Sequence, residues 1–406
     1  MAALHNPFIA LKHRNYRIYA TGLLVSMIGT WMQSIALPWL AYDLTGSPFL
    51  LSLVGALQFL QVLLFSLPAG VLLDRLPLKK MLLWAQGASF LITLLLALLA
   101  FSGHLRYWHL LLFATLQGLV NTLDMPGRQT FTVELVGRSD LMNAIALNST
   151  IFNLSRVLGP ALAGVILAWV GAAQCFLYNA LSYAVLMLAL VFVKPLGVIP
   201  GKKQRGNFQS ALRDIRDGLN YIKRDRVLVE AMVLIGIVGT FVPNFSVSIP
   251  VFTRTILQAG EAGFGYLMAL LGVGSLAGAF FVASISKNGP SRVILRSFPP
   301  VISILLVLSG LASTFWLAAL LLALTGFFFV TFTSTLNSTL QLQSEEAYRG
   351  RVMSVYSLIF GGSTPVGNLY TGLAIESLGA RWGLIACGAI MIPLLLAKPN
   401  PLRQPR

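Results

Sequence analysis

The sequence predicts an all-α polytopic membrane protein with twelve transmembrane helices in two pseudo-symmetric six-helix bundles. The chain has 406 residues, of which 56% are hydrophobic and only 10% are charged, and its mean hydropathy is +0.79. Soluble globular proteins carry about 25% charged residues, so the composition excludes that class. A bilayer core about 30 Å thick takes about 20 apolar residues per helix, and the chain is long enough for about a dozen crossings.

Apolar runs long enough to cross the bilayer follow one another along the whole chain. A helix satisfies its own backbone hydrogen bonds in lipid, which makes it the structure expected for each run. The runs cover residues 18–42, 49–73, 80–101, 108–126, 141–170, 172–193, 227–253, 262–286, 292–312, 315–338, 351–376 and 380–397.

Basic residues set the expected orientation. With a cytoplasmic amino terminus, the outer loops hold only Arg106, Arg254 and Arg381, while all other Lys and Arg except Arg156 fall in inner loops and tails. Because inner loops are enriched in Lys and Arg, we expect a multi-pass protein of the bacterial inner (plasma) membrane with both termini cytoplasmic. Topology and anionic lipid account for the formal charge of +16, so no nucleic-acid partner is expected.

A polar stretch divides the chain into two halves. We expect an amino-terminal bundle at residues 1–193, a cytoplasmic linker at 194–226 and a carboxyl-terminal bundle at 227–406. In the linker, apolar residues recur at steps of three and four, as on one stripe of an amphipathic helix. This helix is expected to lie on the inner membrane face, and binding to a partner protein is the alternative. The stripe consists of Phe208, Leu212, Ile215, Leu219 and Ile222.

The two halves resemble each other weakly. The short charged loop at 74–80 corresponds to 287–292, and the segment 134–164 corresponds to 345–372, with a polar inner loop before a Gly/Pro-broken helix. Repeated six-helix halves are typical of transporters whose substrate path lies between the repeats.

The inner loop at residues 70–80 reads GVLLDRLPLKK. It resembles the G-x-x-x-D-R-x-G-R-K-K signature of the major facilitator superfamily, with Pro77 and Leu78 departing from it. The resemblance implies that the glycine allows helices to approach and that the Asp and its cations latch the inner gate. A simple charged inner loop is the alternative. The residues concerned are Gly70, Asp74, Arg75, Lys79 and Lys80.

The fifth run contains a second motif, RVLGPALAG at residues 156–164. It resembles the Gly-Pro motif of antiporting exporters of the same superfamily, which implies export. Small residues let helices pack closely, and Pro160 removes the amide that would bond the carbonyl of Arg156. Packing alone is the alternative role for Gly159, Pro160 and Gly164.

Further segments of the amino-terminal half resemble the branch of macrolide and siderophore exporters, which includes the enterobactin exporter. They read NYRIY (15–19), GTWMQ (29–33), LPW (37–39), TGSP (45–48), NTLDMPGRQ (121–129) and NAIALNS (143–149). The resemblance implies a secondary active transporter that exports amphiphilic small molecules of drug or siderophore type by alternating access, with protons as the coupling ion.

Other functions remain as alternatives. An importer or a lysophospholipid or lipid flippase could use the same fold, and an integral-membrane transferase is the remote alternative. Catalysis would need clustered His, Asp or Glu, which the sequence does not show. No enzyme activity, cofactor or metal is therefore expected. The expected partners are a small-molecule substrate, protons and the bilayer, and the expected state is a monomer.

The fourth run holds the leading candidate for proton coupling. Many proton-coupled exporters of the superfamily carry an Arg three residues before a Gln-Gly pair, but Ala114 stands at that position before Gln117. We therefore expect coupling at a carboxylate near the membrane boundary, and Asp124 near Arg128 is the first choice. An inner-gate ion pair without a proton cycle is the alternative.

Arg156 is the one cation expected near the middle of the bilayer. A charge at that depth needs a partner, protein or water around it, and no carboxylate is expected at the same level. We therefore expect Arg156 to face the cavity and either to bind a polar or anionic substrate group or to cap carbonyls, with a purely structural role as the alternative.

Other polar and aromatic residues in the spans are also expected to line the path or to join helices. These are Trp31, Gln33, Gln58, Gln61, Gln117, Asn121, Asn148, Asn179, Asn244 and Asn337.

Overall fold

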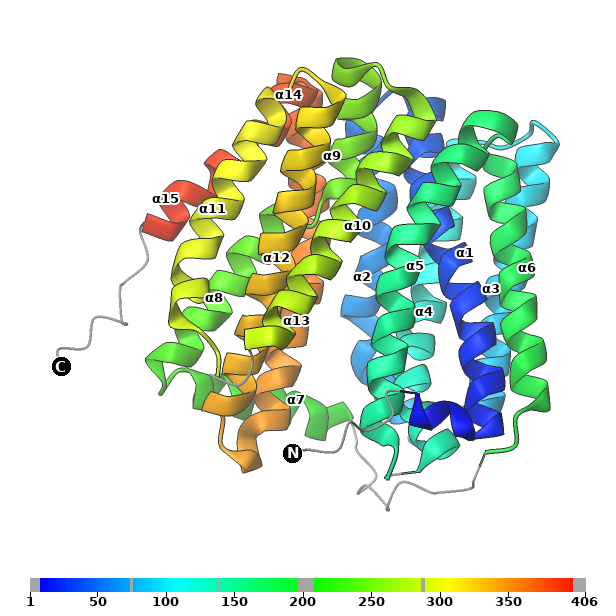
Figure 1. Ribbon diagram of the computed structural model, residues 1–406, viewed down its shortest axis with the longest axis vertical. Coiled ribbons are helices and arrows are strands. Elements are labelled where there is room, and N and C mark those ends of the chain that lie inside the picture. The colour runs from blue at the N-terminus through cyan, green and yellow to red at the C-terminus, as the bar shows by residue number, and fades with distance from the viewer. Residues whose placement is uncertain (1–7, 74–75, 138, 196–207, 286–288, 397–406) are drawn as a thin grey trace. The chain divides into compact units, whose positions relative to one another are not determined.

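The structure is a computed structural model that describes residues 8–73, 76–137, 139–195, 208–285 and 289–396. Helices make up nearly all of this part of the chain, and no β-strand occurs in it (Figure 1). In chain order they are η1 (Ile9–Lys12), α1 (Arg14–Thr45), α2 (Pro48–Leu73), α3 (Leu78–Phe101), α4 (Tyr107–Val136), α5 (Leu141–Val170), α6 (Ala172–Phe192), α7 (Phe208–Ile222), α8 (Arg226–Phe241), α9 (Phe245–Phe252), η2 (Thr253–Leu257), α10 (Gly260–Ile285), α11 (Arg292–Leu311), α12 (Phe315–Gln343), α13 (Glu346–Leu378), α14 (Ala380–Ala389) and α15 (Met391–Leu396).

The helices confirm the all-α membrane class. Within the described ranges, nine helical stretches are long and apolar enough to cross a membrane. The more polar helices α4 and α13, of 30 and 33 residues, and the shorter apolar pair α14 and α15 coincide with the remaining predicted runs. The arrangement is therefore consistent with the predicted twelve crossings.

The seventh predicted run is interrupted. The α8 helix is capped by the preceding residue Asp225, whose carboxylate accepts hydrogen bonds from the backbone amides of Val227 and Leu228. It ends at Phe241, because Pro243 lacks an amide hydrogen and its ring obstructs the preceding turn. The chain resumes as α9 and finishes in the π-helical turn η2, followed by Gln258 in a left-handed conformation with φ of 50°.

Contacts between Cα atoms divide the chain into two compact units. The first unit comprises residues 1–37 and 64–208, and the second comprises 38–63 and 209–406. The chain passes from one unit to the other inside the predicted linker, but the carboxyl-terminal end of α1 and most of α2 belong to the second unit. The domain boundaries at 193 and 227 stay predictions.

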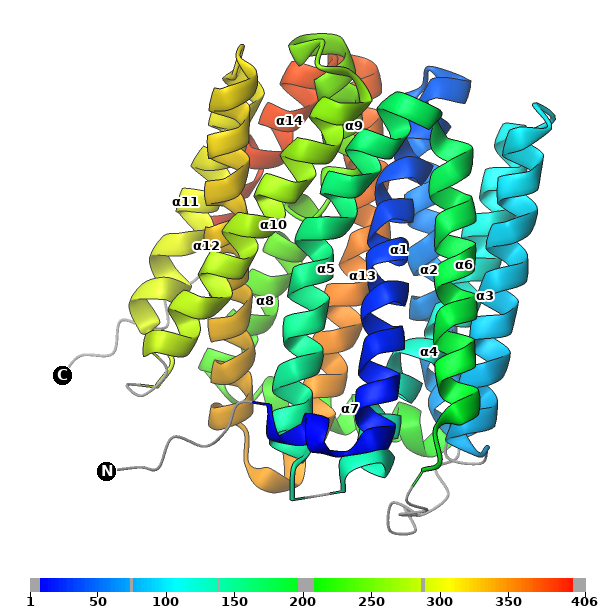
Figure 2. The ribbon, with the colours of Figure 1, turned by 45° about the vertical axis from the view of Figure 1, so that its right-hand side comes forward.

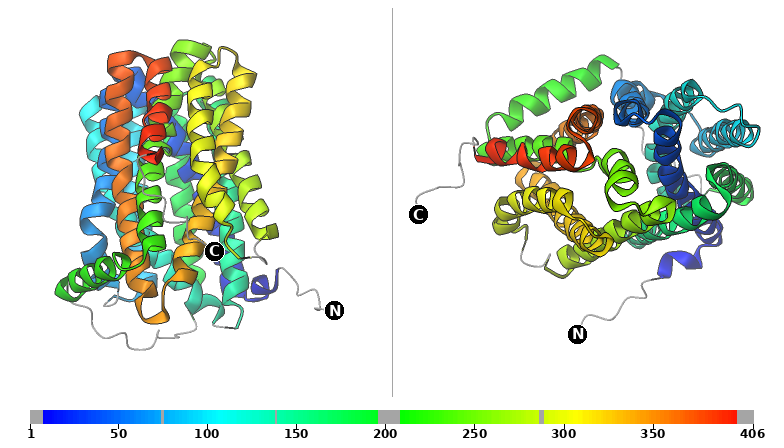
Figure 3. Two further views of the ribbon diagram at one scale, coloured as in Figure 1. Left: turned by 90° about the vertical axis from the view of Figure 1, so that its left-hand side faces the viewer. Right: turned by 90° about the horizontal axis from the view of Figure 1, so that it is seen from above.

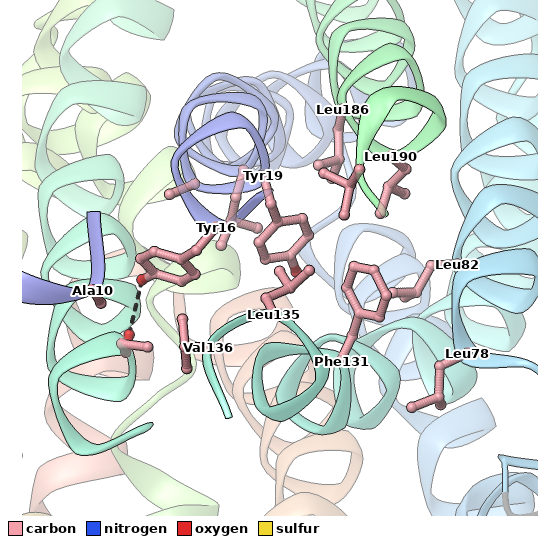
Figure 4. Packing of buried hydrophobic residues seen from close by; sticks show 14 of the residues in the cluster. Ala10, Tyr16, Tyr19, Leu78, Leu82, Phe131, Leu135, Val136, Leu186 and Leu190 are labelled. Atoms are coloured by element: carbon pink, nitrogen blue, oxygen red, sulfur yellow. Dashed lines mark hydrogen bonds between the residues drawn. The ribbon is translucent and has the colours of Figure 1, made fainter. Parts of the chain in front are cut away.

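The first unit has a buried core where η1, α1, α3, α4, α5 and α6 meet (Figure 4). Tyr16 and Tyr19 of α1 are fully buried, and the Tyr19 ring packs edge-on against Phe131 of α4, with 5.6 Å between centroids. The Tyr16 hydroxyl donates to the carbonyl oxygen of Ala144 on α5 at 3.0 Å. The α1 helix therefore contacts α4, α5 and α6, and Figure 2 shows α1, α5 and α6 next to one another.

In the second unit, α10 and α12 approach at glycines. A Cβ atom at Gly274 would collide with the carbonyl oxygen of Ala323, and one at Gly326 would collide with that of Leu271. Each helix thus presents a glycine to the backbone of the other, which permits the close packing found between membrane helices.

The predicted linker helix is present as α7, and it runs across the ends of the longer helices rather than along them (Figure 3). It is fixed to the start of α13. Arg351 forms ion pairs with Asp214 and Asp217 at 2.9 and 3.8 Å, and the rings of Tyr221 and Tyr348 stack with centroids 4.4 Å apart. Its position on the membrane surface stays a prediction.

Candidate transport site

Arg156 lies near the middle of α5. It is fifteen residues from the first residue, Leu141, which places it about 22 Å along the helix at 1.5 Å per residue. Three exposed leucines, Leu154, Leu158 and Leu162, form a ridge with exposures of 41%, 38% and 45%. At 100° per residue, Arg156 is on the opposite side of α5 from this apolar ridge.

The side of α5 that carries Arg156 changes character at this residue. Before it, the same stripe is exposed, with 85% exposure at Met142 and 53% at Ile145. After it, Gly159 and Ala163 are buried. Arg156 therefore lies at the boundary between the exposed amino-terminal half of this stripe and its buried carboxyl-terminal half. The exposed stripe consists of Met142, Ile145, Ser149 and Phe152.

The Arg156 guanidinium has no carboxylate or hydrogen-bond partner in the described part of the chain. Its closest specific contact is Trp31 of α1, whose ring centroid is 5.8 Å from the guanidinium carbon. The Trp31 ring in turn meets the edge of Phe152, with 5.6 Å between centroids and 73° between planes. A cation over an indole gains electrostatic attraction, but the N–H donors stay available.

Gly159 brings α5 against the backbone of α1. A Cβ atom there would collide with the Cβ atom of Trp31 and would lie 3.0 Å from the carbonyl oxygen of Ile28 and 3.1 Å from the amide of Met32. Only glycine fits without displacing one helix. This contact fixes Trp31 beside Arg156, and the neighbouring motif residues Pro160 and Gly164 are buried as well.

Asp124 and Arg128 of α4 form a nearly buried ion pair. The Arg128 Nε atom is 2.7 Å from Asp124 Oδ2, and 11% and 13% of the two side chains are exposed. The amide of Gln86 on α3 donates to Asp124 Oδ1 at 2.6 Å. The carboxylate is thus held from two sides.

Two predicted amides join α1 to α6. The Asn179 amide donates to the Gln33 carbonyl oxygen at 2.8 Å, and both residues are buried. The side-chain Oδ1 atom of Asn179 accepts from the hydroxyl of Ser182 at 3.0 Å. These groups satisfy each other inside the first unit.

Three further predicted residues of the first unit also bond to neighbouring side chains. The Gln117 amide donates to the Ser89 hydroxyl at 3.1 Å and to Asn121 Oδ1 at 3.2 Å. Asn148 Oδ1 accepts from the Tyr16 hydroxyl at 3.0 Å, and its amide donates to Thr132 at 3.0 Å. The fourth helix is thereby tied to α3 and α5.

In the second unit, the predicted polar residues are dispersed. Asn244 is buried and donates to the carbonyl oxygen of Thr240 at 2.6 Å, and Asn337 accepts from Gln341 one turn later at 2.6 Å. Gln58 is half-buried and Gln61 is buried in α2.

The predicted gate motif is described only in part, because Asp74 and Arg75 lie outside the described residues. Lys79 donates to the carbonyl oxygens of Val191 and Val193 at 3.1 and 2.7 Å. A cation at the end of α6 complements the helix dipole. Lys80 is exposed, and a Cβ atom at Gly70 would meet no described atom within 4 Å.

The sequence reasoning missed Gln86, although it is a polar residue inside an apolar run like those that were selected. It also missed an aromatic clamp at the end of α1. Arg254 pairs with Asp43 at 2.6 Å, and its guanidinium carbon lies 5.8 and 5.7 Å from the ring centroids of Trp39 and Tyr42. No group of three or more His, Cys, Asp or Glu side chains in the described ranges could hold a metal ion.

Known proteins align with nearly the whole chain. A family model described as transmembrane secretion effector matches residues 5–404. The staphyloferrin A transporter of Staphylococcus aureus is 25% identical, with 87% of each chain covered. The multidrug efflux pump Tap of Mycolicibacterium fortuitum is 24% identical, with 91% of this chain and 90% of Tap covered. Macrolide efflux protein A of Streptococcus pyogenes is 22% identical, with 97% of each covered.

Solved structures share the fold. A bacterial homolog of the human lysosomal transporter Spinster, inward-facing and unoccupied, has a TM-score of 0.73 at 13% identity, with 95% of this chain and 94% of that chain covered. The nucleoside transporter NupG has a TM-score of 0.74 at 10% identity, with 94% and 98% covered. The chain is therefore a multi-pass membrane transporter rather than an enzyme, and it belongs to the transmembrane secretion effector family of the major facilitator superfamily.

Proposed function

We propose that this protein is a secondary active exporter of amphiphilic small molecules of drug or siderophore type. The observation that carries the proposal is Arg156, a cation in the middle of a spanning helix. It faces away from the apolar ridge, and no carboxylate of the residues that the structure describes pairs with it. The names of the relatives, a siderophore transporter and two efflux proteins, support this class of cargo.

Export would proceed by alternating access between the halves at residues 1–193 and 227–406, with the linker at 194–226 connecting them. In this proposal Arg156 and Trp31 bind the cargo, and the spanning amides contribute polar contacts or join helices. Those amides are Gln33, Gln58, Gln61, Gln117, Asn121, Asn148, Asn179, Asn244 and Asn337.

Proton antiport is the proposed source of energy, and Asp124 is the proposed coupling residue. Protonation of Asp124 would remove the negative charge that Arg128 contacts and would leave the Gln86 amide with a weaker acceptor. The geometry of α3 and α4 would then respond to the proton. The gate would involve Gly70, Asp74, Arg75, Lys79 and Lys80, and the packing of α5 would depend on Gly159, Pro160 and Gly164.

The proposed location is the bacterial inner membrane, with both termini in the cytoplasm and one chain as the working unit. The distribution of Lys and Arg between alternate loops supports this orientation. Reactivity of single cysteines introduced at residues 106 and 213 toward an impermeant reagent in whole cells would test it. Residue 106 should react and residue 213 should not.

The function is tested in inverted membrane vesicles that are energised to acidify their interior. Vesicles with the protein should accumulate macrolides, catecholate siderophores or dyes more than empty vesicles do, and an ionophore should abolish the difference. Accumulation that survives the ionophore contradicts antiport. Cargo movement only in the opposite direction would indicate an importer, and turnover of lysophospholipids alone would indicate a flippase.

A further inference from the structure

The charges inside the first unit do not balance. Away from the first and last turns of its helices, the charged side chains are Asp124, Arg128 and Arg156. Asp124 and Arg128 neutralise each other at 2.7 Å. One positive charge therefore remains, and it belongs to Arg156.

Insertion of an uncompensated cation in a spanning helix is energetically unfavourable. Proteins keep such residues where they serve a ligand or a pathway. Arg156 has neither of two common structural roles, an ion pair or the capping of carbonyl groups. The described residues offer its guanidinium no carboxylate and no carbonyl oxygen within hydrogen-bond distance. The remaining contact, the face of Trp31, attracts the charge but leaves its donors unused.

The stripe of α5 that carries Arg156 is exposed only on the amino-terminal side of this residue. The stripe before it is exposed, as shown by Met142 and Ile145, and the stripe after it is closed by the contact of Gly159 with α1. A molecule that moved along the exposed stripe would meet the guanidinium at its end. On the way it would pass apolar side chains and the ring of Phe152, which is 40% exposed.

These features define the chemistry of a ligand. A guanidinium presents a fork of N–H donors that fits a carboxylate with two parallel hydrogen bonds. The adjacent Trp31 and Phe152 rings offer an apolar and aromatic surface. A cationic ligand would be repelled, because no carboxylate of the first unit's described residues offsets the charge of Arg156.

We propose that Arg156 binds a carboxylate group of the cargo and that the protein selects acidic amphiphiles, with an aromatic or apolar body seated on Trp31 and Phe152, over cationic ones. This inference rests on the proposed export function and narrows it to one charge class.

The test measures binding and transport separately, with the full-length chain and two dyes of opposite charge, carboxyfluorescein and ethidium. Fluorescence anisotropy of purified protein in detergent should show that carboxyfluorescein binds more tightly than ethidium. Arg156→Gln should weaken carboxyfluorescein binding by about tenfold or more. Arg156→Lys, which keeps the charge but loses the fork, should weaken it less. Arg213→Gln is the matched control, because Arg213 is exposed on α7.

Three binding results would overturn the inference. They are equal carboxyfluorescein affinity in the wild type and in folded Arg156→Gln, tighter binding of ethidium by the wild type, and no carboxyfluorescein binding by the wild type. If Arg156→Gln does not fold, the relative affinities for the two dyes in the wild type and in Arg156→Lys test the inference instead.

Transport in energised inverted vesicles separates this inference from the export function. Ethidium accumulation that Arg156→Gln leaves unchanged would overturn the charge selection and keep the exporter. Absence of gradient-dependent movement of every cargo would overturn the exporter, while loss of carboxyfluorescein binding in Arg156→Gln would still support the carboxylate site.

Discussion

Arg128 and Asp124 face each other across one turn of α4, with Nε and Oδ2 2.7 Å apart and only 11% and 13% of their side chains exposed. Removal of one partner from such a buried pair leaves an uncompensated charge and typically costs 3–5 kcal/mol. We therefore expect Asp124→Asn to lower thermal stability in detergent by about 3 kcal/mol.

The double variant Asp124→Asn with Arg128→Gln should recover part of this loss, since it leaves no unpaired charge. Asp214→Asn is the control, because the Asp214–Arg351 pair is exposed and should contribute less than about 1 kcal/mol. Additive losses in the double variant would show that the two charges do not interact.

Gly159→Ala should destabilise the first unit. The added methyl group collides with Trp31 and presses on the α1 backbone, and overpacking of this kind costs about 1–3 kcal/mol. Gly361→Ala is the matched control, since a Cβ atom there would meet no described atom within 4 Å. It should be neutral or stabilising by up to about 1 kcal/mol. Thermal unfolding midpoints measure the stability of both variants. Equal midpoints for Gly159→Ala and Gly361→Ala would contradict the close contact between Gly159 and α1.

Asp140, just before α5, makes a pH-dependent contribution to the free energy of unfolding. Hydrogen bonds from His13 at 2.7 Å and from Lys12 at 2.9 Å lower the pKa of Asp140 below its ordinary value. A lowered folded pKa stabilises the protein above the unfolded value of about 3.9. That stabilisation is lost as the pH falls through the folded pKa.

The stability difference between wild type and Asp140→Asn should therefore be constant near neutral pH and shrink below about pH 4. Thermal unfolding midpoints between pH 3 and pH 7 measure it. A difference that grew on acidification would reverse the sign and refute the interpretation.

Arg351→Ala should release α7 from α13. The variant loses the ion pairs with Asp214 and Asp217 and the packing of Arg351 on the Tyr348 ring, 5.4 Å from the guanidinium carbon. Limited trypsin digestion should then cleave after Arg213 or Arg216 several-fold faster. Arg349→Ala serves as the control, since Arg349 contacts the carbonyl of Gln341 rather than α7. Equal cleavage rates in the wild type and in Arg351→Ala would show that the contacts of Arg351 do not hold α7 against α13.

The sequence predicted the helices well because a spanning helix is specified by a local run of apolar residues. The α5 helix, for example, ends at Val170 as expected and starts at Leu141. The interruption after α8 was not predicted, although Pro243 is visible, because the apolar run continues through it. Single-sequence hydropathy does not distinguish a broken span from a continuous one.

The candidate site was predicted in its residue types but not in its pairings. Asp124 and Arg128 are one turn apart in sequence, so their contact was expected. Gln86 lies on another helix, and only tertiary packing brings its amide to Asp124. Arg156 was expected to have no carboxylate partner, because so few acidic residues occur within the spans, and none meets it in the described residues.

Pro160 gives the Arg156 position a second property. A proline has no amide hydrogen, so the carbonyl oxygen of Arg156, four residues earlier, lacks its usual helical donor. One residue therefore carries a side chain of N–H donors and a main-chain oxygen that lacks its α-helical amide donor. Replacement of the arginine alone would leave that oxygen in place, and only substitution of the proline would occupy it.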